Sequence, residues 1–151
     1  MRHHGLFIGV AGVLLYGCDT VGSEFAVNAA HRSFRAGMTL REVMTATEAA
    51  SEDRRWWNLG AHECGSTPSD FSVSFSEPDG MYAVHRITRL PSLEIEDKKQ
   101  LYTRPALLQL IAEPPLTGCR RFTAAYGNWY VVLVADESGK VKTISTPQFD
   151  G

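Results

Sequence analysis

The apolar run ahead of Cys18 constrains the fold most, because it decides which part of the chain is available to fold. Arg2 is followed by apolar and small residues from Gly5 to Leu14, and Cys18 comes four residues later. The run is shorter than the roughly 20 residues that a membrane-spanning helix needs, and a basic residue precedes it, as in a secretory signal peptide. We therefore expect residues 1–17 to be a signal peptide.

The residues just before Cys18 resemble the lipobox of bacterial lipoproteins. Leu15 is aliphatic and lies three positions before the cysteine, and Gly17 is small and directly precedes it. The resemblance implies that Cys18 carries the lipid, such as palmitate, and anchors a membrane protein of the bacterial cell envelope that faces the periplasm. Asp19 resembles an inner-membrane retention signal, so it favours the inner over the outer membrane without deciding between them. The alternative is an ordinary cleaved secretory signal with an incidental cysteine.

Composition is that of one globular domain. Hydrophobic residues make up 44% of the chain and charged residues 21%, which argues against wholesale disorder. Loss of Arg2 with the signal peptide changes the net charge from -2 to -3, so there is no basic excess that would indicate nucleic-acid binding. Residues 18–30 show little periodicity and are predicted to be a lipidated tether. Residues 31–151 are then a single domain.

The number of cysteines predicts one disulfide. A lipid on Cys18 leaves Cys64 and Cys119, and an oxidising envelope compartment favours joining them. On the loop-entropy model, such a bridge stabilises the fold by roughly 4 kcal/mol.

Two helices are predicted in the first half of the domain. Thr39 and Glu42 have the spacing of a capping box, and an apolar stripe at helical spacing follows them from Leu40 to Ala50. Acidic residues at Ser51-Glu52-Asp53 indicate a second short helix that ends at Gly60. The following stretch of glycine, serine, threonine and proline, residues 60–69, is predicted to be a loop.

Two hairpins are predicted after this loop. Phe71, Val73 and Phe75 alternate with serines, residues 77–80 have turn chemistry, and residues 81–89 return as the partner strand. Residues 129–135 and 141–146 form the second hairpin around a turn at 136–140.

The stretch between the hairpins is the least regular. Residues 105–113 suggest a short helix with proline in its first turn, although a buried strand is also compatible with the pattern. The predicted fold class is α+β, with two N-terminal helices packed on one face of an antiparallel sheet of about four strands, formed by two hairpins with an insert between them.

Two segments resemble the SmpA/OmlA family of small bacterial lipoproteins, a BamE-like family whose fold is related to that of the β-lactamase inhibitor protein. Residues 34–43 resemble the family's helix start, "Gly-Met-Thr, two residues, Val", and residues 129–141 resemble its closing strand and "Asp-Gly-Lys-Val" turn. The stretch from Pro91 to Cys119 has no counterpart in the short family members. The resemblance implies a small α+β lipoprotein that works as an interaction or assembly protein.

Catalytic and metal-binding chemistry is weakly represented in the sequence. The cluster His62-Glu63-Cys64 offers a thiol, an imidazole and a carboxylate, but three consecutive residues do not easily converge on one point. His85 lies in a predicted strand with no identifiable partner, so a structural role is the more common one. No enzyme, metal or cofactor motif is recognised, and we predict no catalytic residues, no cofactor and no small-molecule substrate.

Aromatic residues beside arginines are the candidates for a partner surface, because tryptophan, tyrosine and arginine dominate binding hot spots. Adjacent helical tryptophans cannot both point inward, so we expect one of Trp56 and Trp57 to be exposed, and we choose Trp57 with Arg55 as the hot spot. The candidate surface comprises Arg54, Arg55, Trp56 and Trp57. Weaker candidates are the pairs Trp129-Tyr130 and Arg120-Arg121.

The sequence thus favours a lipid-anchored, non-enzymatic interaction or assembly protein with an envelope protein partner. The alternative is a periplasmic inhibitor or immunity-type protein that binds and blocks a hydrolase. A flat aromatic and basic patch near the tether would favour the first function, and an aromatic and acidic loop protruding from the sheet would favour the second.

Overall fold

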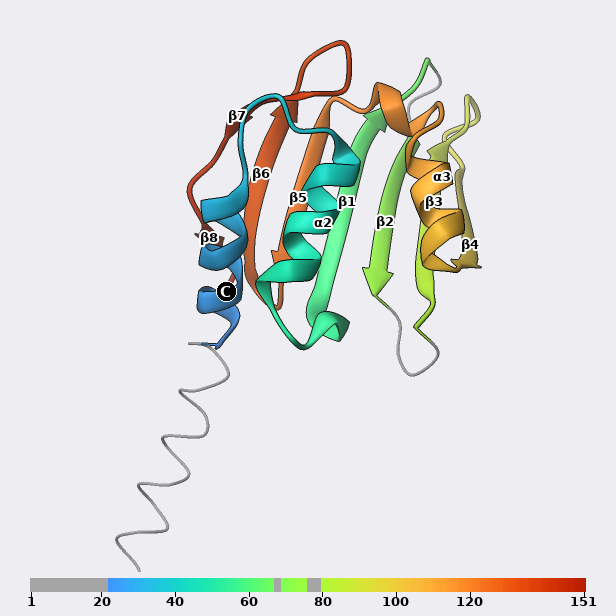
Figure 1. Cartoon of the computed structure of the whole chain (residues 1–151). Helices are drawn as coiled ribbons and strands as arrows, with labels where there is room; N and C mark the ends of the chain where they lie inside the picture. Colours follow the sequence, from blue (N-terminus) through green and yellow to red (C-terminus); the bar gives the residue numbers. More distant parts are fainter. Residues whose placement is uncertain (1–21, 67–68, 76–79) are drawn as a thin grey trace, which may run out of the picture.

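The computed structural model describes residues 22–66, 69–75 and 80–151. The expected signal peptide, Cys18, Asp19 and most of the turn expected at 77–80 lie outside these ranges. Among the described residues, the helices cover one face of a single antiparallel sheet, and the opposite face has no helix on it (Figure 1).

The described strands form an eight-stranded sheet in the order β4-β3-β2-β1-β5-β6-β7, with β8 also paired to β6. The strands are β1 (Trp57–Cys64), β2 (Ser69–Phe75), β3 (Tyr82–Arg89), β4 (Ile95–Tyr102), β5 (Arg121–Tyr126), β6 (Trp129–Ala135), β7 (Val141–Ile144) and β8 (Gln148–Phe149). The helices are an N-terminal helix over residues 22–33, α2 (Leu40–Ala50) and α3 (Arg104–Ile111), with the 3-10 turns η1 (Arg54–Trp56) and η2 (Leu116–Gly118).

The predicted sheet of about four strands, with two N-terminal helices as its only helical layer, is therefore wrong. The expected insert is part of the sheet and its cover: β4 extends the sheet at its edge, and α3 packs beside α2 on the helical face (Figure 1). Residues of β4 are mostly exposed, because β3 is its one partner among the described strands. The alternation of apolar and polar residues that reveals a half-buried strand is consequently absent from it.

The predicted second helix is also wrong. Only Arg54–Trp56 is helical, as the single turn η1, and the chain enters β1 at Trp57. The side chains of Trp57, Leu59 and Ala61 are buried, whereas those of Asn58 and His62 are partly exposed. Burial at every second residue is the pattern of a strand. Because β1 pairs with β2 on one side and β5 on the other, it occupies the middle of the sheet, where a loop had been expected after Gly60.

The predicted tether is too long. Residues 22–33 are helical, and Ala26, Val27, Ala30 and Phe34 lie in the core. Their spacing of one, three and four residues forms one face of a helix. Three of the four are alanine or valine, so the stripe gives a weak hydrophobic signal, and the assignment of residues 22–30 to a tether missed it.

Several local predictions are confirmed. The Thr39 hydroxyl accepts a hydrogen bond from the Glu42 N–H at 3.3 Å and the Glu42 carboxylate accepts one from the Thr39 N–H at 3.2 Å, so the capping box starts α2. Thr103 caps α3, which has Pro105 in its first turn. The hairpins β2–β3 and β6–β7 form where the sequence predicts them.

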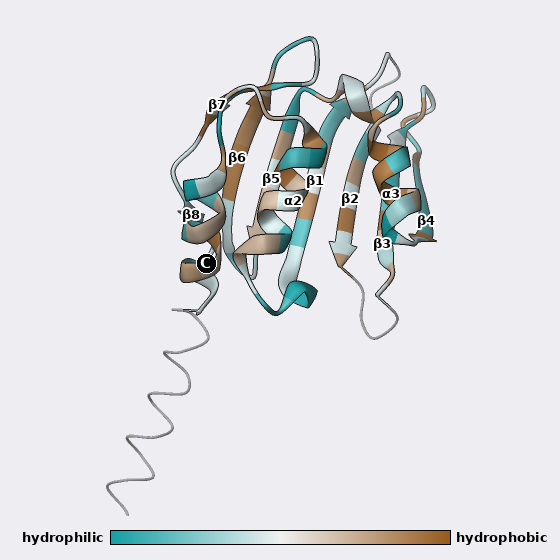
Figure 2. Cartoon of the chain, in the orientation of Figure 1, coloured by the Kyte–Doolittle hydropathy of each residue, from teal (hydrophilic) through white to brown (hydrophobic). Residues whose placement is uncertain are grey.

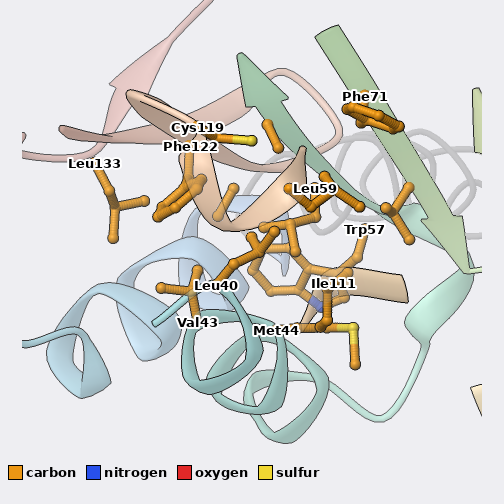
Figure 3. Close-up of a cluster of buried hydrophobic side chains, with 14 of the residues drawn as sticks. Leu40, Val43, Met44, Trp57, Leu59, Phe71, Ile111, Cys119, Phe122 and Leu133 are labelled. Carbon is orange, nitrogen blue, oxygen red and sulfur yellow. The ribbon is translucent and has the colours of Figure 1, made fainter. Parts of the chain in front are cut away.

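The core lies between the helices and the sheet. Strands alternate hydrophobic and hydrophilic residues, as the banding of β1 and β2 shows (Figure 2). The hydrophobic side chains meet those of α2 and α3, including Met44 and Ile111 (Figure 3). The other face of the sheet, which we call the helix-free face, carries the alternate residues, such as Ser72 and Ser74 of β2.

The disulfide joins Cys64 and Cys119, the pair expected from the sequence. Cys64 ends β1 and Cys119 comes shortly before β5, which is the neighbour of β1 in the sheet. The Arg120 N–H also donates to the His62 carbonyl at 3.0 Å. The bridge therefore fixes one end of the two central strands to each other.

Candidate interaction surface

The candidate surface of Arg54, Arg55, Trp56 and Trp57 lies where the chain leaves α2 and enters the sheet. The turn η1 contains the first three residues, and Trp57 opens β1. In Figure 1 this turn is at the lower end of the sheet, and the first described residues of the N-terminal helix lie at the same end. We call this the lower end of the sheet from here on.

Trp57 does not belong to the surface. Its side chain is 2% exposed and meets the Tyr126 ring edge-on, with 5.1 Å between the ring centroids. Figure 3 shows it among core side chains that include Met44 and Ile111. The choice of Trp57 as the hot spot is therefore wrong, because the strand register turns this residue toward the helices.

Trp56 is the exposed member of the pair. It is 61% exposed and ends η1. Of the two neighbouring tryptophans, Trp57 is therefore a core residue and Trp56 is a surface residue. An exposed tryptophan supplies a large apolar area with little conformational freedom to lose, which suits it to binding a partner.

Arg55 is held by Asp53. Its guanidinium donates to both carboxylate oxygens of Asp53 at 3.0 Å, and its backbone N–H donates to the same carboxylate at 3.2 Å. The hydrogen bond from Arg55 lowers the pKa of Asp53, and desolvation opposes this change. The pair caps η1 and fixes the turn on which Trp56 is presented.

Glu48 of α2 also contacts the turn η1, through Arg54, and it binds residues of β3 and α3. This carboxylate of α2 is 6% exposed and accepts hydrogen bonds from the Tyr82 hydroxyl at 2.7 Å and from the Arg104 guanidinium at 3.0 and 3.1 Å. Arg54 approaches it at 3.8 Å. Burial, followed by the hydrogen bond to Glu48, raises the pKa of Tyr82, and the hydrogen bond to Glu48 raises the pKa of Arg104.

This ion pair could not be predicted from the sequence, because its members come from α2, η1, β3 and α3. Glu48 lies on a helix whose apolar stripe was recognised, but nothing in a single sequence shows that Arg104 will reach it. The sequence signal for this contact was the charged residue Glu48 at the border of the apolar stripe of α2. The ion pair joins α2 to α3, and Arg54, 3.8 Å from Glu48, is its contact with η1.

The helix-free face carries a second polar cluster. The His62 Nε2 lies 3.1 Å from the Thr123 hydroxyl, and its Nδ1 lies 3.8 Å from a carboxylate oxygen of Asp70. Burial lowers the pKa of His62, the charge of Asp70 opposes this, and that of Arg121 adds to it. Gly60 makes the pair possible, because a side-chain carbon there would collide with both His62 and Thr123.

This arrangement does not provide the parts of a hydroxyl-nucleophile site. Thr123 lies on β5 between β1 and β6, so the backbone groups around it are used in sheet pairing. A covalent mechanism needs free donors aimed at the oxyanion that forms beside the nucleophile. The cluster is better explained as a hydrogen-bonded part of the sheet.

The consecutive residues His62, Glu63 and Cys64 do not converge. Cys64 is buried in the disulfide, His62 lies on the helix-free face, and Glu63 is exposed with a φ of 56°. His85 lies on β3 with its Nδ1 3.4 Å from the Asp97 carboxylate. Neither histidine is brought to a cysteine.

The weaker candidates are less suited to binding than Trp56. Trp129 and Tyr130 are half-buried and face opposite sides of the sheet, as alternation requires, and Trp129 packs against Phe149. Arg120 and Arg121 are exposed beside the disulfide. A hollow of about 180 Å³ is lined by Arg86, Thr88, Glu96 and Lys98, where Lys98 pairs with Glu96 at 2.8 Å.

Metal ligands and membrane spans were sought over the described part of the chain. No three His, Cys, Asp or Glu side chains gather there in a way that could hold a metal ion. No helix in the same ranges is long and apolar enough to cross a bilayer. No family model, curated protein or solved structure was found to match the chain.

Proposed function

We propose that this protein is a lipid-anchored lipoprotein of the bacterial cell envelope that acts as a non-enzymatic interaction or assembly protein, with Trp56 at the centre of its partner surface. The observation that carries the proposal is the exposure of Trp56 on a turn held by two ion pairs. A rigid exposed aromatic loses little entropy on binding, so it can concentrate binding energy.

The position of the anchor supports this proposal. Gly22, the first described residue, lies four positions after Cys18, and a fully extended chain of that length reaches about 14 Å. A lipid on Cys18 would therefore keep the lower end of the sheet close to the membrane. The turn η1, with Arg54, Arg55 and Trp56, lies at this end (Figure 1), so an anchored protein would present these side chains to the membrane or to a membrane-bound partner protein.

The resemblance to the SmpA/OmlA family remains part of the proposal. Its two segments lie side by side: the Gly37 N–H donates to the Val141 carbonyl at 2.7 Å, and the Val141 N–H donates to the Met38 carbonyl at 2.8 Å. Gly37 has a φ of 91°, a conformation that favours glycine. The two segments that resemble the family are therefore hydrogen-bonded to each other and form one structural unit.

The test is recovery of the full chain from membranes in a mild detergent, followed by identification of co-purifying proteins. An envelope protein that is recovered with the wild type, but not with Trp56→Ala, supports the proposal. Leu93→Ala is the matched control, because Leu93 is 92% exposed at the β3–β4 turn. Recovery of a hydrolase whose activity is blocked would instead favour the inhibitor function.

The anchor is tested separately with a fatty-acid probe. Wild type should incorporate the probe and sediment with membranes, and Cys18→Ser should lose the label and accumulate unprocessed or mislocalised. Wild type that is soluble in the periplasm and unlabelled would contradict the lipid anchor and leave the ordinary secretory signal as the explanation.

A further inference from the structure

The strand β4 forms a long and regular edge of the sheet (Figure 1). It pairs with β3 along its whole length, from Ile95 opposite Arg89 to Tyr102 opposite Tyr82, without a bulge. All but two of its residues are exposed, and β3 is its one partner among the described strands. An edge strand of this kind is a ready template for a further strand.

The backbone of β4 offers hydrogen-bonding groups to such a strand. The Glu94 carbonyl, just before β4, accepts from the Leu90 N–H at 2.8 Å, so it points toward β3. In an antiparallel pair, successive residues point their backbone groups alternately toward and away from the partner. The residues whose backbone groups point to the open edge are therefore Ile95, Asp97, Lys99 and Leu101.

The opposite edge of the sheet is different. β7 has four residues and its pairing with β6 is interrupted by a register shift, and β8 contributes a further two residues beside β6. Short and irregular edge strands are a common protection against unwanted pairing. Of the two edges, that of β4 is therefore the one suited to pairing.

The side chains along β4 are complementary to those of a second copy. If two copies pair in antiparallel fashion about a two-fold axis at Lys98, Asp97 of each copy lies opposite Lys99 of the other. In the same register Ile95 lies opposite Leu101, and these side chains are 66% and 52% exposed in the single chain. Opposite charges, and apolar residues, that face each other across two strands stabilise the pairing.

Neighbouring two-fold registers lack this match. An axis at Asp97 or at Lys99 brings that residue opposite its own copy, and like charges directly opposite each other are destabilising. An axis at Glu96 or at Gln100 places a charged residue opposite an apolar one. The register centred on Lys98 is therefore the one with complementary charges, and it pairs all of residues 95–101.

Lys98 makes the unfavourable contact in this register, because it meets its own copy at the axis. Its side chain is 74% exposed and pairs with Glu96 of its own strand at 2.8 Å. Solvent and the neighbouring carboxylate both weaken the repulsion between the two lysines. Two pairs of opposite charge, Asp97 with Lys99 on either side of the axis, therefore outweigh this contact.

We propose that the protein forms a homodimer in which β4 pairs with β4 of a second copy, antiparallel and centred on Lys98. The two sheets become one continuous sheet. A two-fold axis perpendicular to this sheet leaves the helices of both copies on the same face. When the axis lies along the membrane normal, both N-terminal helices are on one side, so anchors on both copies can enter one membrane. The inference goes beyond the proposed function and does not rest on it, because the pairing depends on neither Trp56 nor Cys18.

The dimer is tested by co-purification of two differently tagged full chains in a large excess of detergent micelles. Wild-type chains should capture each other. Asp97→Lys places lysines opposite each other and Lys99→Asp places aspartates opposite each other, so each variant should bind its own copy about 10-fold more weakly. Chains of the two variants should bind each other like wild type, because mixing restores opposite charges at both pairs.

Matched controls make the same changes of charge away from β4. Glu137→Lys and Lys142→Asp alter exposed positions after β6 and on β7, so each should bind its own copy like wild type. Equal weakening by these controls would assign the effect to net charge and would contradict pairing through β4.

The register is tested by disulfide trapping. Glu96 lies opposite Gln100 of the other copy in a pair without backbone hydrogen bonds, where the Cα atoms are about 4.5 Å apart and a disulfide can form. Glu96→Cys chains should therefore cross-link to Gln100→Cys chains, and neither should cross-link to itself above the wild-type background. Lys98→Cys chains should cross-link to themselves, because that residue lies at the axis.

Several outcomes would overturn the proposal. These are wild-type chains that do not capture each other, and Asp97→Lys chains that fail to bind Lys99→Asp chains when mixed. Cross-linking of Glu96→Cys to itself, or none between it and Gln100→Cys, would overturn the register. None of these results alters the Trp56-dependent recovery of a partner from membranes, so the dimer and the proposed function can fail independently.

Discussion

Glu48 of α2 accepts two hydrogen bonds from the Arg104 guanidinium, although the two residues are 56 positions apart. The contact ties α2, which precedes the β1–β4 meander in the chain, to α3, which follows it. Tyr82 shares the same carboxylate. A carboxylate this deeply buried depends on its partners, because water cannot replace them.

Arg104→Met should therefore destabilise the fold. We expect a loss of about 2 kcal/mol in the free energy of unfolding, less than for a fully buried pair because the Arg104 side chain is 43% exposed. Chemical denaturation measures it. Arg41→Ala, at an exposed position of α2, is the control and should change the value by no more than about 0.5 kcal/mol. Equal effects of both substitutions would show that the ion pair contributes nothing.

Trp56 and Trp57 should respond in opposite ways to alanine substitution. Trp57→Ala empties a buried site and should cost about 3–5 kcal/mol of stability. Trp56→Ala should leave the melting temperature nearly unchanged and reduce partner affinity by about 2 kcal/mol. Thermal unfolding and partner recovery measure the two effects. A Trp56→Ala protein that binds its partner normally would move the interaction surface elsewhere.

The Cys64–Cys119 bridge should account for a substantial part of the stability. Because it closes a loop over a separation of 55 residues, replacement of both cysteines by alanine should cost about 4 kcal/mol on the loop-entropy model. Thiol titration of the denatured, unreduced domain should find neither cysteine free. Two titratable thiols in the purified protein would contradict the bridge.

Protonation of His62 should make the free energy of unfolding depend on pH. Its pKa in the folded protein lies below 6.5, so below about pH 6.5 the unfolded chain takes up a proton that the folded one resists. Stability is thus complete above that pH and falls as the pH decreases toward the folded pKa of His62. Denaturation between about pH 7.5 and 5 should show a smaller fall for His62→Gln.

Asp70→Asn provides the complementary variant. Because the charge of Asp70 raises the pKa of His62, its removal should lower that pKa further and enlarge the fall in stability at acid pH. A profile identical to that of the wild type would show that Asp70, at 3.8 Å, has no influence on the imidazole.

Local chemistry made parts of the fold predictable. Thr39 and Glu42 specify the start of α2 through contacts three residues apart, and Phe71, Val73 and Phe75 reveal β2 by alternation. These signals depend on near neighbours. The long edge strand β4 gives no such signal, since exposure on both faces removes any preference for apolar residues at alternate positions.

The candidate site was predictable only in part. That one of two adjacent tryptophans is exposed follows from the geometry of any element. Which one is exposed depends on where η1 ends and β1 begins, and this boundary is fixed by pairing of Trp57 with Tyr126 and of Asn58 with Ser74. Those partners lie far along the chain, so the sequence around Trp56 does not contain the information.

The position of the disulfide bears on how the protein tolerates proteolysis. The loop that it closes, residues 65–118, contains β2, β3, the edge strand β4 and α3. A single cut anywhere in this loop would leave a nicked chain whose two fragments remain covalently joined at the central strands. Cleavage at the exposed turns of this half would therefore not release β1 from β5, and both fragments would stay attached to the N-terminal part of the chain.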